Sequence, residues 1–198
     1  APFDPYPYLL DWKPCVGAYG LLAPLYAHLG RDPYPASLMQ QRAPRVYRWL
    51  ERMNRPDQDV PEFFTPGTDF LNNDEIPATL LAVLRAVAED FVPETRAAAS
   101  VINHWLAQQQ PEAGAAAVGR LDNLLGRAEV RVRGRAVTAL ASPYRFYLLQ
   151  RVQAIYAGLP LDEQASVEQL LQACGMHEML SIKLDRVMGR ADNLEVWQ

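Results

Sequence analysis

The chain has 198 residues, of which 49% are hydrophobic and 21% charged, as in an ordinary folded globular protein. It carries 19 Lys and Arg against 23 Asp and Glu, and this formal net charge of −4 argues against a dedicated nucleic-acid binder, which would present a basic face. The two cysteines, Cys15 and Cys174, form no CxxC pair. We therefore expect buried free thiols in a reducing, cytoplasmic setting, with neither a disulfide scaffold nor a zinc site.

The first expected helix covers residues 15–29, where apolar side chains occur on every side. A helix of that kind is normally buried all round, so we expect it to be the most buried element of the chain. Pro24 should kink or break it, and Gly30 should end it. The uncharged stretch 14–30 is too short and too often interrupted by Pro and Gly to span a bilayer, so no membrane partner is expected.

Two shorter helices follow, over residues 35–42 and from Pro44 to about Met53. Pro44 suits the first helical position because its missing N–H would have no partner there in any case. The second of these helices has an apolar face that includes Trp49 and Leu50, whereas Arg52 belongs to the expected solvent face. Residues 54–72 are rich in proline and read as a long loop that contains the aromatic pair Phe63 and Phe64.

A helix capped by Asn73 or Asp74 should run to a break at Pro93, and a further helix should end near Gln109. Residues 110–119 are rich in Ala and Gly and favour a flexible link. The alternation of Val130 and Val132 with charged residues predicts a β-hairpin near 128–138.

The last part of the chain is again helical. Ser142 and Pro143 predict the start of a helix that ends near Ala157, and an amphipathic helix is expected over 162–174, ending at Gly175. A short helix or turn should follow over 177–182. The sequence thus predicts a mainly α fold with one small β-hairpin.

An ordered series of segments between residues 8 and 53 carries a family resemblance. The segments are Tyr8-Leu9-Leu10, Pro14 to Tyr19, Tyr26 to Leu29 and Ala43 to Trp49. They resemble the C-terminal helical domain of glutathione S-transferases, in which a buried central helix precedes a helix that begins near proline and carries a tryptophan. Asn72 to Leu80 and Ser142-Pro143-Tyr144 resemble a longer bacterial-type branch of glutathione-transferase-like proteins. The resemblance implies a glutathione-transferase C-terminal-like region over 1–109 and a helical extension over 110–198, packed on the same core.

The sequence departs from the family pattern in two ways. Where the family's central helix begins with a capping box, this chain has Cys15 and Ala18, which cannot make those hydrogen bonds. No thioredoxin-like domain precedes Ala1, so the resemblance implies a fragment of a parent protein in which glutathione binds to the missing domain. The resemblance implies that the parent is a glutathione-transferase-like enzyme that uses glutathione, and we expect this chain alone to be inactive and to hold no cofactor.

Candidate site residues are few. Tyr144, Arg145 and Tyr147 could line an apolar substrate pocket at the start of a helix, although core packing explains them as well. Arg131, Arg133 and Arg135 would share one face of a strand, either as a solvated face or as a patch for an anion or an acidic partner. The three histidines, His28, His104 and His177, show no catalytic or metal-binding spacing, and we expect neither catalytic nor metal residues.

Three functions remain as hypotheses. The first is the helical, substrate-pocket-forming part of a glutathione-transferase-like protein, with a hydrophobic small molecule as ligand. The second is a non-catalytic interaction or assembly module of the same fold, since a fold does not fix a function. The third is an unrelated helical binding protein that uses Phe63 and Phe64. Self-association is expected if a partial domain exposes apolar surface.

Overall fold

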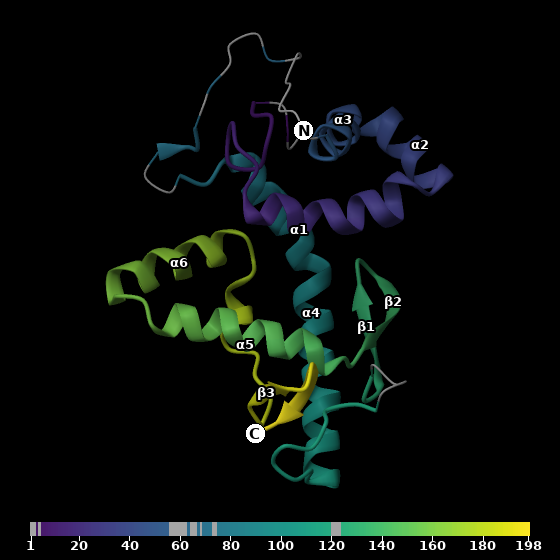
Figure 1. Cartoon of the computed structure of the whole chain (residues 1–198), viewed down its shortest axis with the longest axis vertical. Helices are drawn as coiled ribbons and strands as arrows, with labels where there is room; N and C mark the ends of the chain where they lie inside the picture. The colour runs from purple at the N-terminus through teal and green to yellow at the C-terminus, as the bar shows by residue number, and fades with distance from the viewer. Residues whose placement is uncertain are drawn as a thin grey trace. The chain divides into compact units, whose positions relative to one another are not determined.

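The computed structural model describes residues 3, 5–55, 63, 67, 69–72, 75–119 and 124–198. The chain divides into two compact units, unit 1 over Ala1–Val83 and unit 2 over Leu84–Gln198. The boundary lies inside a long helix, whereas the division expected at residues 109 and 110 falls within unit 2. Figure 1 shows a mainly helical chain with two small β-hairpins, so the expectation of a single hairpin is wrong.

Unit 1 contains α1 (Val16–Pro24), the π-helical η1 (Leu25–Gly30), α2 (Pro33–Arg42) and α3 (Pro44–Met53). The change from α to π geometry follows Pro24 directly, as expected for a residue that cannot donate the regular backbone hydrogen bond. Prolines occupy the first turns of α2 and α3, which confirms both helix starts to within two residues. Cys15 provides no side-chain cap to α1, as its side chain predicts.

The core of unit 1 forms around α3. Trp49 is fully buried and stacks on Phe3 with ring centroids 4.8 Å apart. Arg52, which we expected on the solvent face, is buried: its Nη2 donates to the carbonyl of Pro7 at 3.0 Å, and its guanidinium lies over the ring of Tyr8. Periodicity alone assigned Arg52 to the surface. The spacing of apolar residues gives no information about a distant carbonyl that can accept a hydrogen bond from a buried guanidinium.

The expectation that α1 is buried on all sides is wrong. Ala18 is its one buried residue, while Val16 and Tyr19 are 91% and 55% exposed. Apolar side chains occur on all sides of this helix, but the core residues of unit 1 pack against one side of it. Phe63 packs edge-on against Trp12 at 5.6 Å, as an aromatic loop residue should, whereas Phe64, Asn73 and Asp74 lie outside the described residues.

Unit 2 is organised along α4 (Ala78–Gln109), which runs through Pro93 without ending there, so the predicted break is wrong. Tertiary packing offsets the lost hydrogen bond, because Val92 and Thr95 on either side of the proline are buried. Further along, Ala98, Ile102 and Leu106 contribute the helix's apolar face to the unit 2 core, which also includes Phe146 and Trp197.

Unit 2 also contains two antiparallel β-hairpins. The first, β1 (Arg127–Val132) with β2 (Arg135–Leu140), confirms the prediction near 128–138. The second, β3 (Met188–Ala191) with β4 (Leu194–Trp197), was not predicted. Residues 114–117 hydrogen-bond to β4, with the Gly114 N–H 2.7 Å from the Trp197 carbonyl, so the expected flexible link at 110–119 is wrong.

The remaining elements of unit 2 are α5 (Pro143–Ala157), α6 (Leu161–Ala173) and the 3₁₀ turn η3 (His177–Leu180), which confirm the three helical predictions. Ser142 precedes α5 without a side-chain cap, and Gly175 adopts φ of +76°, the left-handed conformation expected after α6. Figure 1 shows α5 and α6 as a helical hairpin joined by a short turn.

Candidate functional site

A cavity of about 490 Å³ in unit 2 lies between one face of α5 and the segment that leads into β3. This volume falls within the range of roughly 300 to 1,000 Å³ that is common for small-molecule sites. Six of the seven α5 side chains share one helical face, with spacings of three, four and seven residues, and Arg151 lies beside that face. The cavity is lined by Phe146, Leu149, Gln150, Arg151, Gln153, Ala154, Ala157, Ile182, Lys183, Leu184, Arg186 and Val187.

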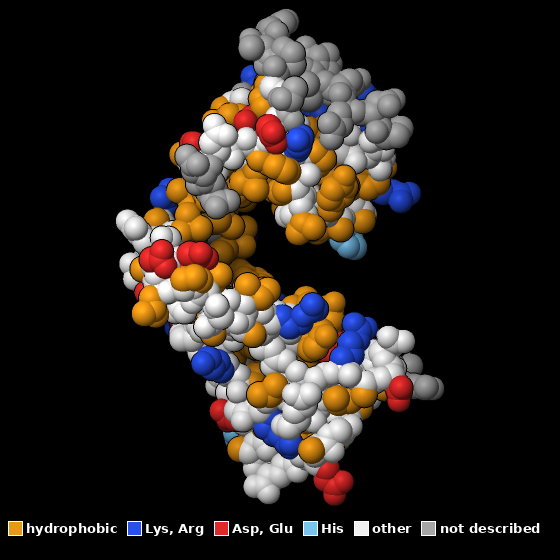
Figure 2. Space-filling view, turned by 60° about the vertical axis from the view of Figure 1, so that its left-hand side comes forward, with side chains coloured by type: hydrophobic (Ala, Val, Ile, Leu, Met, Phe, Trp, Pro, Cys, Tyr) orange, Lys and Arg blue, Asp and Glu red, His pale blue; other side chains and the backbone are white. Residues whose placement is uncertain are grey.

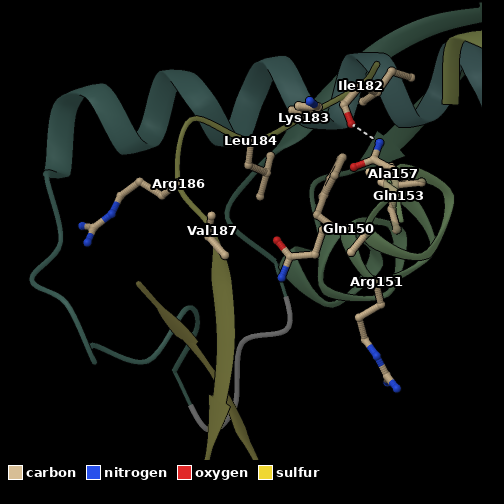
Figure 3. Close-up of a pocket in the computed structure, with 12 residues that line it drawn as sticks. Gln150, Arg151, Gln153, Ala157, Ile182, Lys183, Leu184, Arg186 and Val187 are labelled. Atoms are coloured by element: carbon tan, nitrogen blue, oxygen red, sulfur yellow. Dashed lines mark hydrogen bonds between the residues drawn. The ribbon is translucent and has the colours of Figure 1, made fainter. Parts of the chain in front are cut away.

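Two glutamine amides fix the walls of this cavity. Gln153 donates from Nε2 to the carbonyls of Met179 and Ile182, at 2.7 and 2.9 Å. Gln150 accepts from the Met188 N–H at 3.1 Å and donates back to the Met188 carbonyl. Figure 3 shows these amides between α5 and the 182–187 segment. They hold that segment against α5 by satisfying its main-chain groups.

The charged lining is entirely positive. Arg151, Lys183 and Arg186 contribute cations, and no carboxylate, imidazole, thiol or hydroxyl is present among the 12 lining side chains. Arg186 donates to the carbonyls of Gln198 and Pro111, while Arg151 lies 5.7 Å from the centre of the Tyr147 ring.

Within the described ranges, none of these three cations has an Asp or Glu carboxylate within 4.0 Å. Figure 3 shows the Arg151 and Arg186 guanidiniums directed away from the middle of the cavity, at its margin. The chemistry of this lining is therefore suited to binding rather than to acid–base catalysis.

The residues predicted from the sequence lie elsewhere on α5. Tyr144 stacks against Tyr147 with ring centroids 6.3 Å apart, and neither lines the cavity. The guanidinium of Arg145 lies 3.2 Å from a Glu94 carboxylate oxygen and over the ring of Phe91, so it joins α5 to α4. The structure thus brings Tyr144 and Tyr147 together and directs Arg145 to a partner within the unit.

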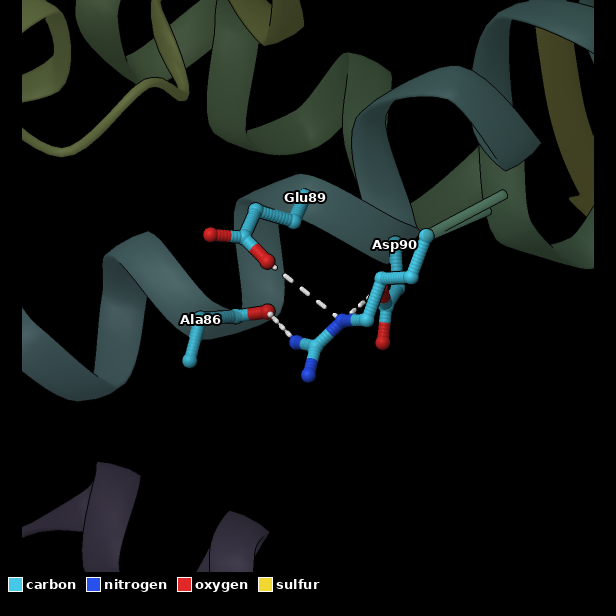
Figure 4. Close-up of polar contacts among 4 residues, drawn as sticks. Ala86, Glu89 and Asp90 are labelled. Carbon is cyan, nitrogen blue, oxygen red and sulfur yellow. Dashed lines mark hydrogen bonds and ion pairs between the residues drawn. The ribbon is translucent and has the colours of Figure 1, made fainter. Parts of the chain in front are cut away.

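The arginine cluster of the first hairpin is also divided. Arg133 is not on a strand but in the turn, with φ of +49°, so it does not share a strand face with Arg131 and Arg135. Its guanidinium contacts Glu89 and Asp90 and donates to the carbonyl of Ala86 at 3.0 Å (Figure 4). An anion patch over this hairpin would therefore have to form without Arg133.

The titratable groups with shifted pKa values lie away from the cavity lining. A hydrogen bond to Glu168 raises the pKa of Tyr156 above its ordinary value. In unit 1, burial and the nearby Glu75 raise the pKa of Asp11, whereas hydrogen bonds from Lys13 and the Phe70 N–H lower the pKa of Asp69.

Over the part of the chain that the structure describes, no cluster of three or more His, Cys, Asp or Glu side chains could hold a metal ion. In the same residues, no helix combines the length and the apolar character needed to cross a membrane.

Sequence reasoning did not find this cavity. Its two walls come from separate stretches of the chain, residues 146–157 and 182–187. Seen alone, the 182–187 wall has no regular spacing. The available signal was the absence of acidic residues from α5, which carries Arg145 and Arg151 and neither Asp nor Glu. Comparisons of the chain with protein-family models, with curated proteins and with solved structures gave no match.

Proposed function

We propose that unit 2 binds an apolar small molecule that carries an acidic group, in the cavity between α5 and residues 182–187. The observation that carries this proposal is the lining: aliphatic and aromatic walls with Arg151, Lys183 and Arg186 at the margin and no carboxylate. Binding of an apolar ligand would remove surface of the cavity walls and of the ligand from water. The acidic group of the ligand would meet cations that have no Asp or Glu partner among the described residues.

The preferred charge of the ligand follows from the same lining. A neutral ligand would gain from apolar burial alone, whereas a cationic one would be repelled by three like charges. The Gln150 and Gln153 amides are already bonded to main-chain groups, so the cations rather than the amides should set the preference for the ligand's polar end.

A matched pair of fluorescent probes tests the proposal. 1-Anilinonaphthalene-8-sulfonate and N-phenyl-1-naphthylamine share an apolar body and differ in one sulfonate group. We expect saturable binding of both, with the sulfonate bound more tightly. The double variant Arg151→Gln/Lys183→Gln should lose about fivefold or more in affinity for the sulfonate and less than about twofold for the neutral probe.

Two controls keep the test specific. Arg127→Gln/Arg135→Gln removes the same charge from exposed positions on the first hairpin and should leave both affinities unchanged. Ala154→Phe, which adds bulk within the cavity lining, should weaken both probes, while Ala136→Phe on β2 should weaken neither. Equal binding of both probes to wild type and to the double variant would refute the anion preference, and unaltered binding to Ala154→Phe would refute the location.

We also propose that the chain is the helical, pocket-forming part of a glutathione-transferase-like protein whose thioredoxin-like domain binds glutathione. Its support is the ordered series in residues 8–53 together with a helix that begins at Pro44 and carries Trp49. On this proposal the chain by itself binds glutathione weakly. Calorimetric titration with glutathione is the test, and a micromolar dissociation constant for the isolated chain would contradict the division of roles.

A further inference from the structure

Residues 182–187, which form one wall of the cavity, have almost no main-chain partners. They belong to neither a helix nor a strand. Among the described residues, the main-chain groups of 183–187 make one hydrogen bond to another main-chain group, from the Gln198 N–H to the Val187 carbonyl at 2.9 Å. A stretch of the same length inside a helix or sheet would make several such bonds. We call residues 182–187 the strap.

Side-chain amides take the place of main-chain partners in the strap. Asn103 of α4 donates to the Lys183 carbonyl at 3.2 Å and accepts from the Asp185 N–H at 3.0 Å. The amides of Gln153 and Gln150 on α5 bind main-chain groups at the first residue of the strap and just after its last. Figure 3 shows the strap beside α4 on its way into β3. Its position therefore depends on three side chains from two helices.

The strap is exposed between buried ends. Ile182 and the adjoining Met188 are 7% and 3% exposed, whereas Val187 is 59% exposed. Apolar side chains reach the surface in other parts of the chain as well (Figure 2), so the exposure of Val187 alone would mean little. Together with the scarcity of main-chain hydrogen bonds, this exposure identifies the strap as a segment that opens at low cost in free energy.

The strap leads directly into the C-terminal hairpin. Strand β3 begins at Met188, and β4 pairs both with β3 and with residues 114–117. The Trp197 N–H donates to the Ala115 carbonyl at 3.0 Å, and the buried Trp197 ring stacks on Trp105 of α4 with centroids 6.0 Å apart. Neither tryptophan lines the cavity. A change in the strap can therefore reach residues that a ligand in the cavity does not touch.

We propose that ligand binding in the cavity is coupled to the docking of residues 182–198, the strap and the C-terminal hairpin together. This inference rests on the proposed function and adds the regulation of the same site. Five of the 12 lining residues belong to the strap, so a ligand that contacts α5 and the strap together binds the docked form more tightly than the open form. By linkage, the ligand then favours docking as much as docking favours the ligand.

Hydrogen exchange of the whole chain, followed by mass spectrometry, tests the coupling with 1-anilinonaphthalene-8-sulfonate as the probe. A ligand that binds the docked form alone lowers the open population in proportion to its concentration, so a probe concentration of about ten times its Kd should slow exchange about tenfold. The slowing should appear in residues 183–187 and also in 115–117 and 195–197, which do not line the cavity. Residues 127–140, the first hairpin, should exchange at an unchanged rate.

Three variants locate the effect. Asn103 does not line the cavity and acts on it through the strap, as a positioning residue. In Asn103→Leu, residues 183–187 should exchange about tenfold faster than in wild type, and the bound probe should still slow them. Gln109→Leu makes the same kind of change at the exposed end of α4 and should exchange as wild type does. Ala154→Phe, which adds bulk to the cavity lining, should lose the protection at the same probe concentration.

The outcomes separate this inference from the proposed function. Saturable binding of the probe with unchanged exchange of residues 183–187 would overturn the coupling and leave the binding site in place. Protection confined to the strap, with none at 115–117 and 195–197, would overturn the link to the C-terminal hairpin. Unchanged exchange in Asn103→Leu would overturn the positioning role of Asn103. A probe that does not bind the wild-type chain would overturn the proposed function and the coupling together.

Discussion

The side-chain amide of Gln150 makes two hydrogen bonds with the main chain of Met188, one from the Met188 N–H at 3.1 Å and one to its carbonyl. The amide thereby occupies the outer edge of β3 as a neighbouring strand would. Met188 is 3% exposed, so water cannot readily replace this partner. One side chain of α5 thus fixes both the start of the second hairpin and a wall of the cavity.

Replacing Gln150 by Leu should lower the free energy of unfolding by about 1 to 3 kcal/mol, because a buried N–H and carbonyl lose their partners. Chemical denaturation followed by circular dichroism measures the change. Gln109→Leu, at the exposed end of α4, makes the same chemical change and should alter stability by less than about 0.5 kcal/mol. Equal stability of the two variants would show that the edge of β3 does not depend on Gln150.

Arg145 and Glu94 form a pair whose side chains are 23% and 28% exposed, less solvated than the pairs on the surface of this chain. Arg145→Met should destabilise unit 2, and a double-mutant cycle with Glu94→Gln should give a coupling of about 1 kcal/mol. Denaturant titrations of the four proteins provide the values. Additive effects of the two substitutions would show that the pair contributes nothing.

The same variant separates a structural role of Arg145 from a role in ligand binding. Because its guanidinium is occupied by Glu94 and does not line the cavity, Arg145→Met should change the affinity for 1-anilinonaphthalene-8-sulfonate by less than about twofold while the fold persists. A large loss of affinity at unchanged helix content would favour the sequence-based hypothesis that Tyr144, Arg145 and Tyr147 form the pocket.

Local signals in the sequence were sufficient for much of the fold. Pro44 and Pro143 marked helix starts, Gly175 marked a helix end, and the alternation at Val130 and Val132 identified the first hairpin. The second hairpin was missed because strands of four residues carry almost no periodicity. Its turn residues, Asp192 and Asn193, both adopt positive φ, and this Asp-Asn pair was the available signal.

The remaining errors concern packing between distant segments. Pro93 predicted a helix break, but the helix continues because Val92 and Thr95 are buried on either side of it. Apolar residues on all sides of α1 predicted a fully buried helix, but most of α1 is not buried. The cavity joins α5 to residues 182–187, and no local pattern reports such a contact. Tyr144, Arg145 and Tyr147 lie on α5, the helix that also lines this cavity, but none of the three is among its lining residues.

Gly134 gives a test of the first hairpin. It lies in the turn with φ of +78°, and a Cβ there would meet no atom within 4 Å. Gly134→Ala should therefore destabilise unit 2 by about 1 kcal/mol through backbone strain alone. Gly20→Ala, in α1 with equally open space and no positive φ, should instead stabilise unit 1 by about 0.5 to 1 kcal/mol. Thermal unfolding by calorimetry compares the two, and stabilisation by both substitutions would contradict the turn conformation.

Asp11 gives a prediction about pH in unit 1. Its Oδ1 is buried with no hydrogen-bond partner among the described residues, and burial together with the nearby Glu75 raises the pKa of this carboxyl above its ordinary value of 3.8. A raised pKa in the folded state means that folding favours the protonated carboxyl. The stability of unit 1 that depends on Asp11 is thus fully present below pH 3.8 and is lost as the pH rises through the raised pKa.

Asp11→Asn should therefore be more stable than wild type at pH 7, because it removes an unfavourable buried charge, and the advantage should disappear near pH 3, where the wild-type carboxyl is protonated. Asp69→Asn should behave in the opposite way. Lys13 and the Phe70 N–H lower the pKa of Asp69, so its contribution is present above pH 3.8 and is lost as the pH falls through the lowered value. Urea titrations at the two pH values measure both effects, and an Asp11→Asn protein less stable than wild type at pH 7 would show that the Asp11 charge is favourably solvated in the fold.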